Sequence, residues 1–262
     1  MLVAAAVCPC PPLLVPDVAA GAAPELDAAR VACADAVGLL AASRPDLLVV
    51  VGPDAEPAGT RRYPAGTAGD FRGFGVSVDV RLGSPDAGPA PTPELDPVSA
   101  PAPARDSESA PARPPLPASL AVGAWLLGRA RWAGAPVEGL AVDERLAPDR
   151  CAETGRELAA RAPRVALLVM GDGSACRTVK APGYLDERAA GFDARAARSL
   201  GSADVAALAA IDADLAYELK AAGRAPWQVL AGAGEAAGES LEGRLYYEDA
   251  PYGVGYTVAT WS

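Results

Sequence analysis

The chain has 262 residues, a formal net charge of −10 and no histidine. Hydrophobic residues make up 51% of it, which is enough for one large buried core. The negative charge disfavours general electrostatic binding to nucleic acid or to an anionic membrane surface, whereas small neutral or cationic ligands are compatible with it.

The apolar runs, the first residues and the cysteines bear on the compartment. The longest apolar runs, 47–51 and 165–170, are much shorter than a membrane-spanning helix. The first residues lack the positive charges of a secretion signal. Five scattered cysteines favour free thiols over a disulfide framework; they are Cys8, Cys10, Cys33, Cys151 and Cys176. We therefore expect a cytoplasmic protein with no membrane partner and no direct nucleic-acid partner, and a homo-oligomer stays open.

Strand-like and helix-like segments alternate along the first half of the chain. The apolar run 2–7 predicts a strand buried on both faces, and residues 24–42 predict a helix. Residues 46–54 (DLLVVVGPD) predict a second buried strand that ends in a Gly-Pro turn. Alternating apolar and polar residues predict a partly exposed strand over 74–82. The Pro/Ala-rich stretch 83–117 has few bulky apolar residues, so we expect a mobile insertion there.

The same alternation continues to the end of the chain. It predicts helices over 119–131 and 148–162, strands over 137–142 and 164–170, two or three helices within 186–222, a short helix over 226–233, and a hairpin of 244–247 with 254–260. Strands separated by helices indicate an α/β protein, a three-layer α/β/α sandwich with a mostly parallel central sheet and a C-terminal antiparallel hairpin, in a single domain over 1–262. The most apolar strands, 2–7, 47–51 and 165–170, should lie adjacent in the middle of this sheet.

Three of the buried strands end in loops that carry candidate functional residues. These loops are Cys8-Pro9-Cys10, Gly52-Pro53-Asp54 and the segment from Gly171 to Cys176. Because ligands bind beyond the carboxyl ends of parallel strands, we expect the loops to form one cleft for a small molecule. Cys10, Asp54 and Cys176 should line this cleft, with Cys8 and Asp172 close behind them.

The thiols of this predicted cleft allow more than one function. Cys8, Cys10 and Cys176, together with a carboxylate from Asp54 or Asp172, could surround a transition metal, because thiolates select zinc, copper(I) or iron. The alternative is that Cys8 and Cys10 are small buried apolar residues. Cys176 and Asp172 are also candidate catalytic residues, although a Cys-His pair is impossible without histidine. Without a metal, we expect neutral thiols in an acidic pocket.

The loop after the strand 164–170 allows two interpretations. Gly171, Gly173 and Ser174 can present backbone N–H groups to an anionic group such as a phosphate, with Arg177 and Lys180 supplying positive charge. The alternative is a tight turn in which both glycines have positive φ. The glycine spacing matches neither the dinucleotide fingerprint nor the Walker pattern.

Taken in order, several segments resemble the LigB-like superfamily, named for the B subunit of class III extradiol ring-cleavage dioxygenases, and in particular an uncharacterised actinobacterial branch of it. The segments are AAAVCPCPPLLVP, DLLVVVGPD, VALLVMGDGSACRTVKAPGYLDERAAGFD, GRAPWQVLAGA and YEDAPYGVGYTVATW. The resemblance covers nearly the whole chain except 83–117. It implies the same three-layer fold and an origin among oxidoreductases.

The departures from the family pattern concern its iron site. The family holds iron(II) with two histidines and one glutamate, and another histidine acts as acid and base. The resemblance places Cys10 and Asp54 at the ligand histidines, Cys176 near the acid–base histidine, and Gly223 or Arg224 near the glutamate. Since the chain has no histidine, the resemblance implies that ring cleavage by the family mechanism is not expected.

Three functions stay open at this point. The first is a dioxygenase-like protein with a histidine-free Cys/Asp site that binds zinc, copper or iron and has redox activity. The second is a metal-free pseudoenzyme that binds a small molecule or a partner. The third is an auxiliary to tRNA modification, which the resemblance implies because genes of related actinobacterial proteins lie beside those for adenosine-37 prenylation. The net charge of −10 argues against direct contact with tRNA.

Overall fold

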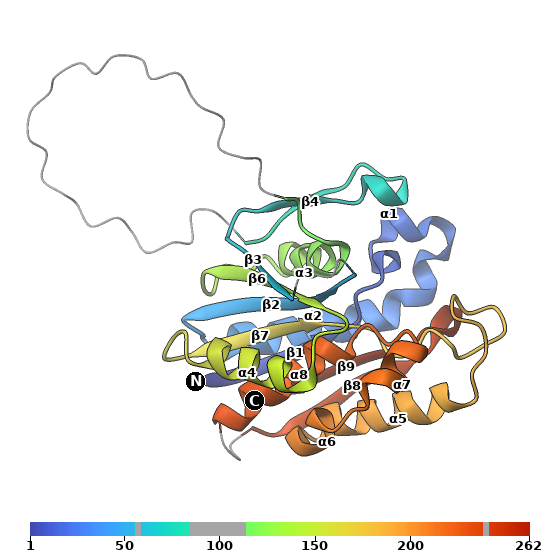
Figure 1. Cartoon of the computed structure of the whole chain (residues 1–262). Coiled ribbons are helices and arrows are strands. Elements are labelled where there is room, and N and C mark those ends of the chain that lie inside the picture. Colours follow the sequence, from blue (N-terminus) through green and yellow to red (C-terminus); the bar gives the residue numbers. More distant parts are fainter. Residues whose placement is uncertain (56–58, 84–113, 238–240) are drawn as a thin grey trace, which may run out of the picture.

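The computed structural model describes residues 1–55, 59–83, 114–237 and 241–262 (Figure 1). The strands are β1 (Leu2–Cys8), β2 (Leu47–Asp54), β3 (Thr60–Tyr63), β4 (Ala68–Asp70), β5 (Asp79–Arg81), β6 (Val137–Asp143), β7 (Val165–Met170), β8 (Gly243–Asp249) and β9 (Tyr256–Trp261). The helices are α1 (Pro16–Ala19), α2 (Asp27–Ala42), α3 (Ala118–Arg129), α4 (Pro148–Ala159), α5 (Arg188–Gly201), α6 (Val205–Ala209), α7 (Ala213–Glu218) and α8 (Arg224–Ala237). None of the helices described here has the length and apolar character needed to cross a membrane.

The predicted central strands are adjacent and parallel, as expected. The main sheet has seven strands in the order β3-β6-β2-β7-β1-β9-β8, and β6, β2, β7 and β1 run parallel to one another. Val169 of β7 pairs with Val51 on one side and Val7 on the other. The edge strand β3 and the closing hairpin of β8 and β9 supply the antiparallel part. The prediction of a mostly parallel sheet with a C-terminal antiparallel hairpin is therefore confirmed.

Helices cover both faces of the sheet, which gives three layers (Figure 1). Side chains alternate along a strand, so neighbouring residues enter different halves of the core. Val7, Val49 and Val169 pack in the half that contains residues of α4, α5 and α8. Ala6, Val50 and Leu168 pack in the half that contains residues of α2 and α3. Burial on both faces explains why these strands have unbroken apolar sequences.

Several boundaries differ from the sequence-based expectations. The helix expected over 24–42 begins at Asp27, because Pro24 lies in 3-10 turns that precede it. The strand expected over 74–82 shortens to β5, which pairs with β4 in a separate two-stranded sheet. The expected short helix near the C-terminus is the longer α8. Residues 84–113, on which the expectation of a mobile insertion falls, lie outside the described residues.

Helices α4 and α8 approach each other closely through two glycines. A Cβ added at Gly155 of α4 would overlap the carbonyl oxygen of Val229 and lie 2.6 Å from the amide nitrogen of Ala233. A Cβ added at Gly232 of α8 would likewise overlap backbone atoms of Ala152. Because the atoms that meet here belong to the backbone, no flexible side chain can move aside for a larger residue. The short distance between the two helices therefore requires glycine at both positions.

Gly155→Ala tests this close approach. We expect it to lower the free energy of unfolding by about 2–3 kcal/mol, because the added methyl group forces two buried helices apart. Gly38→Ala on α2 is the matched control, since a Cβ there meets no atom within 4 Å. It should raise the free energy by about 0.5–1 kcal/mol through helix propensity. Urea unfolding followed by circular dichroism measures both, and equal stability of the two variants would contradict the prediction.

Candidate functional site

The carboxyl ends of the parallel strands form one continuous edge. Asp54 at the end of β2 pairs in register with Asp143 at the end of β6. Cys8 at the end of β1 pairs with Met170 of β7, and the N–H of Gly171 then donates to the Cys8 carbonyl oxygen (3.0 Å). The loops after β1, β2, β6 and β7 therefore begin side by side. We call this edge the carboxyl edge.

Asp172 and Cys10 meet directly at the carboxyl edge. The backbone N–H of Cys10 donates to Asp172 Oδ1 (2.8 Å), which joins the loop after β1 to the loop after β7. Surrounding protein atoms shield the Asp172 carboxyl from water and raise its pKa to about 7, although the hydrogen bond from Cys10 acts in the opposite direction. Asp172 can therefore exchange a proton near neutral pH, which is the property required of a general acid or base.

Two further groups complete the surroundings of Asp172. Burial raises the pKa of the Cys10 thiol well above its usual value, and the negative charges of Asp172 and Glu144 raise it further. Tyr256 of β9 is 2% exposed, and burial followed by the charges of Asp172 and Cys10 raises its pKa. Cys10 is thus a neutral thiol among acidic groups, as expected, and Tyr256 keeps its phenolic proton. Glu144 and Tyr256 were missed from the sequence, because the predicted strand 137–142 that precedes Glu144 and the predicted hairpin that contains Tyr256 were not assigned to the cleft.

Glu144 links this group to the other strand ends. Burial raises the pKa of its carboxyl, and the nearby charges of Asp143 and Asp54 raise it further, while Arg224 lowers it. The N–H of Glu144 also donates to the backbone carbonyl oxygen of Asp54 (3.3 Å). Asp54 therefore lies at the carboxyl edge as predicted, where its carboxyl group acts on Glu144 as part of a cluster of like charges.

Cys176 does not share a cleft with Cys10, which corrects the expectation. Cys10 packs in the half of the core that contains α2 and α3, whereas Cys176 packs in the half that contains α5 and α8. The Cys176 thiol is 2% exposed and donates to the carbonyl oxygen of Leu219 (3.4 Å). Burial, with the charge of Asp186, raises its pKa, so it is not an activated nucleophile. The chain crosses to the other face of the sheet within the loop that follows Asp172.

The thiols and carboxylates do not fit the transition-metal site considered from the sequence. Cys8 is fully buried, and its thiol interacts with that of Cys33 on α2, which raises its pKa. Cys10 lies among acidic groups that disfavour its thiolate, and Cys176 packs in the other half of the core. Among the described residues, no group of three or more Cys, Asp or Glu side chains is arranged to hold a metal ion. The donor set of Cys8, Cys10, Asp54 and Cys176 is therefore not assembled at one point.

The loop after β7 uses its N–H groups within the protein instead of presenting them to an anion. The N–H groups of Gly171, Gly173 and Ser174 donate to Cys8 O, Gly255 O and Asp193 Oδ1, respectively. Neither glycine has positive φ, so the alternative of a tight turn with both glycines at positive φ is also wrong. At Gly171 the requirement is close packing, since an added Cβ would lie 2.5 Å from Gly223 Cα. Gly171, Gly173 and Ser174 are thus structural.

Asp193 on α5 explains the rest of this loop. Its carboxylate is 5% exposed and accepts from the Ser174 hydroxyl (2.7 Å) and from the Arg177 guanidinium (3.0 Å). The Arg177 guanidinium, expected to bind an anion, therefore forms an internal ion pair with Asp193 instead. Lys180 is exposed and has no ion pair among the described residues. Asp193 was missed from the sequence because a single acidic residue in a helix predicts no role.

A pocket of about 400 Å³ opens beside Glu144 at the carboxyl edge. Its charged and aromatic lining consists of Glu144, Tyr217, Glu218, Lys220 and Arg224. The Arg145 guanidinium lies over the Tyr217 ring (3.9 Å to the centroid), which adds a cation–π contact at one side. Cys10 and Asp172 do not line this pocket. Glu144 does line it, and its charge also raises the pKa of the Cys10 thiol. We call this cavity the edge pocket.

Arg224 provides a fixed positive charge at the edge pocket. It is 3% exposed and donates to the carbonyl oxygens of Leu146 (2.6 Å) and Glu144 and to Oε1 of Gln228 (3.0 Å). Burial lowers the pKa of its guanidinium. Nearby, the buried Nε1–H of Trp227 has no acceptor among the described residues and lies close to Gly171.

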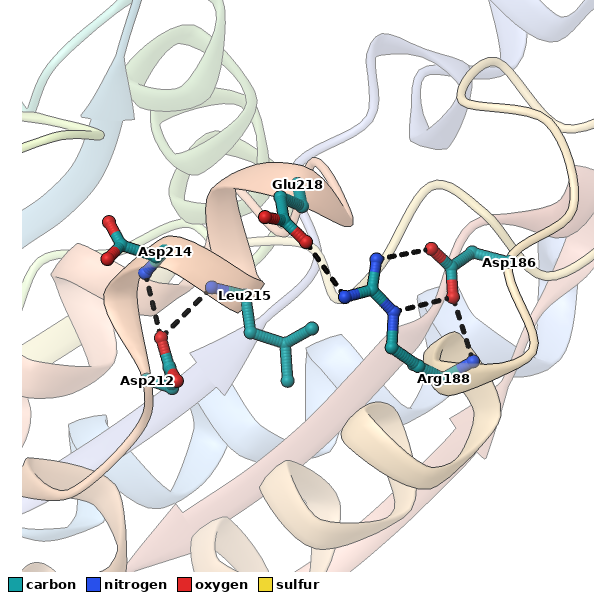
Figure 2. Close-up of polar contacts among 6 residues, drawn as sticks. All are labelled: Asp186, Arg188, Asp212, Asp214, Leu215 and Glu218. Carbon is teal, nitrogen blue, oxygen red and sulfur yellow. Dashed lines mark hydrogen bonds and ion pairs between the residues drawn. The ribbon is translucent and has the colours of Figure 1, made fainter.

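Helix α7, which carries Tyr217 and Glu218 of the edge pocket, is fixed at both ends (Figure 2). At its start, the Asp212 carboxylate accepts two backbone N–H groups of the first turn. At its end, Arg188 donates to Glu218 (2.8 Å) and to both oxygens of Asp186 (2.7 and 3.0 Å). The guanidinium lowers the pKa of Asp186 to about 2. Arg188 therefore ties α7 to the loop that follows β7.

The geometry defines a class of protein: an α/β/α sandwich with an acidic carboxyl edge. No protein-family profile and no curated protein sequence matches the chain. Among solved structures, the chain is similar to the crystal structure of uncharacterized protein JW3007 from Escherichia coli K12, with a TM-score of 0.53 and 18% sequence identity over 99% of each chain. At this identity the likeness shows a shared fold that extends over the whole chain.

The raised pKa of Asp172 predicts a pH-dependent effect on stability. Between about pH 4 and pH 7 the folded state binds more protons than the unfolded state, so the free energy of unfolding falls as pH rises through this range. Asp172→Asn keeps an oxygen acceptor for Cys10 and removes this dependence. The free energy of unfolding of the variant minus that of the original chain should therefore be larger at pH 8 than at pH 4, by up to about 4 kcal/mol.

Urea unfolding at the two pH values measures this difference. Asp35→Asn, which changes an exposed carboxylate on α2, is the control and should show no comparable shift. An Asp172→Asn variant whose stability relative to the original chain is the same at both pH values would show that this carboxyl ionises normally.

The environment of Cys10 predicts slow alkylation. At pH 7 iodoacetamide should modify Cys10 at least about tenfold more slowly than in the urea-unfolded chain, because the thiolate fraction falls tenfold for each unit of pKa. Glu144→Gln should increase the rate by removing one of the charges that disfavour the thiolate. Peptide mass spectrometry measures the rate at each cysteine. Equal rates in folded and unfolded protein would contradict the prediction.

Proposed function

We propose that this protein is a LigB-like protein without the iron site of that family, and that it binds a small molecule at the carboxyl edge with Asp172 as the group that exchanges a proton with it. The observation that carries the proposal is the Asp172 carboxyl, which titrates near pH 7 while bonded to the backbone of Cys10. The resemblance of the sequence supports the family assignment, and the site supports the chemistry.

The surroundings of Asp172 favour a ligand that donates hydrogen bonds and carries no negative charge. Carboxyl groups end β2 and β6 and continue at Glu144, so an anion would be repelled. When ionised, Asp172 can accept a proton or a hydrogen bond from a ligand hydroxyl, and Tyr256 retains a proton beside it. A neutral aromatic diol combines two hydroxyl donors with an apolar body and matches the ring chemistry of the family that the sequence resembles.

The proposal makes the carboxyl edge a binding site that uses acid–base chemistry of the chain's own residues. The residues present do not fit an iron or zinc centre, so no step is assigned to a metal. The role in tRNA modification rests on the family resemblance alone, and no observation in the structure favours it. A metal-free small-molecule-binding protein of dioxygenase-like fold is therefore the function that the site supports best.

Catechol binding tests the proposal. Isothermal titration calorimetry at pH 5.5, 7 and 8.5 should show affinity rising with pH around a midpoint near 7, because ionised Asp172 accepts from the diol while catechol itself stays mostly protonated, as phenols do. The gain should be at least about tenfold, which is the contribution of one hydrogen bond to a charged group. Asp172→Asn should remove the pH dependence, and Asp35→Asn should retain it.

Metal analysis separates this proposal from the metal-binding alternative. Protein purified without an affinity tag should contain no stoichiometric zinc, copper or iron. A stoichiometric metal that disappears in Cys10→Ser would replace the proposal with a Cys/Asp metal centre. Absence of catechol binding at every pH, or pH dependence that survives in Asp172→Asn, would overturn the role of Asp172.

A further inference from the structure

A second cavity lies on the opposite side of the molecule's core from α5 and α8, between α2 and α3. It has a volume of about 350 Å³, which is within the size range of small-molecule sites. Small residues of α2, among them Ala34, Gly38 and Ala41, form one wall. The other wall consists of the last turn of α3 and the residues that follow it. We call this cavity the α2–α3 groove, and it shares no lining residue with the edge pocket.

The charge of the α2–α3 groove differs from that of the other described cavities. The edge pocket contains two basic and two acidic residues, and so do a cavity between α5 and α7 and one beside the β4–β5 sheet. The α2–α3 groove contains three arginines, Arg30, Arg129 and Arg131, and none of its lining residues is Asp or Glu. In a chain with a net charge of −10, this is a local concentration of positive charge.

Two of these arginines remain available to a ligand. The Arg30 guanidinium is used internally, because it donates to Leu14 O (2.7 Å), Ala23 O (2.7 Å) and Asp27. By contrast, the guanidinium groups of Arg129 and Arg131 have no hydrogen bond or ion pair among the described residues. The guanidinium groups that can still bind a ligand therefore lie at the end of α3.

Aromatic side chains lie beside the free arginines. The Arg129 guanidinium lies over the Trp125 ring, 5.1 Å from its centroid, in a cation–π contact that leaves a planar cationic group beside an aromatic side chain. Trp132, which also lines the groove, is held in place because its Nε1–H donates to Ala135 O (2.9 Å). Both tryptophans are half-buried, in contrast to Trp227 and Trp261, which are 1% and 0% exposed. The groove thus offers apolar stacking surface as well as charge.

Arg131 occupies a backbone conformation that favours glycine. It has φ of 51°, and the N–H groups of Arg131 and Trp132 donate to Gly128 O (3.1 Å) and Leu127 O (3.0 Å), which is the pattern that ends many helices. An arginine at this position costs backbone strain that a glycine avoids. Stability alone would therefore favour glycine at this position, although the residue there carries a positive charge at the groove.

We propose that the α2–α3 groove binds a small anion with a flat aromatic body, such as an aryl carboxylate. The ring stacks on Trp125 and Arg129, and the acid group pairs with Arg131. Small side chains on α2 leave room for the ring; for example, a Cβ placed on Gly38 meets no atom within 4 Å. This binding is independent of the carboxyl edge, because the two sites differ in residues and in charge.

Titration with 1-naphthoate tests the proposal, with 1-naphthalenemethanol as the neutral analogue of the same shape. The indole N–H signals of protein labelled with nitrogen-15 are assigned with Trp125→Phe and Trp132→Phe. Naphthoate should shift the signals of Trp125 and Trp132 and leave those of Trp227 and Trp261 unchanged. It should bind at least about fivefold more tightly than the alcohol, because only the acid pairs with arginine.

Arg131→Gly separates ligand binding from stability. It should weaken naphthoate binding at least about fivefold and leave the melting temperature unchanged or higher, since glycine removes the strain at positive φ. Arg198→Gln, which removes an exposed arginine from α5, is the charge-matched control and should change the affinity less than about twofold.

Three outcomes would overturn the proposal. One is equal affinity for naphthoate and naphthalenemethanol, and another is full affinity in Arg131→Gly. The third is a naphthoate-bound spectrum in which the signals of Trp125 and Trp132 do not move, which includes failure to bind at all.

Discussion

Burial of β7 on both faces, between β1 and β2, is the constraint on which the rest of the structure depends. All six residues of β7 are 0% exposed, so helices must cover both sides of the sheet at this strand. The parallel register then places the ends of β1, β2 and β7 at one edge. The same alternation of side chains that fills both halves of the core also separates the functional groups. Cys10 stays on the α2–α3 face, and Cys176 goes to the other.

The sequence predicted the features that depend on long apolar runs, and it failed where distant segments meet. The strands around β7 and the closing hairpin follow from local pattern, whereas the strand expected over 74–82 is reduced to β5, which pairs with β4 outside the main sheet. At the site, strand order alone brought Asp172 close to Cys10. The position of Cys176 depends instead on Asp193, which lies on the next helix and draws Ser174 and Arg177 inward. No spacing of residues along the sequence predicts such a contact.

Arg224 shows how an acidic edge is stabilised by the chain itself. Like-charged carboxyl groups at the ends of β2 and β6 repel one another, and a cation lowers that cost. Here the cation is a guanidinium, which carbonyl oxygens of Glu144 and Leu146 hold in place. Its charge offsets part of the rise that burial, Asp143 and Asp54 cause in the pKa of Glu144. The pKa of Asp172, about 7, is raised by burial instead, so the depth of this carboxyl group in the protein is what lets it exchange a proton at neutral pH.

The net charge of −10 is a poor guide to what this protein binds, because its charges are unevenly distributed. At the carboxyl edge, Asp143 and Glu144 lie near the buried guanidinium of Arg224, and Asp54 adds its charge beside Glu144, so an anionic ligand meets repulsion. At the α2–α3 groove, arginines face the cavity without acidic partners among its lining residues. Electrostatic attraction falls off within about 10 Å at moderate salt, so each site responds to its own residues and not to the total. One chain can therefore select ligands of opposite charge at two places.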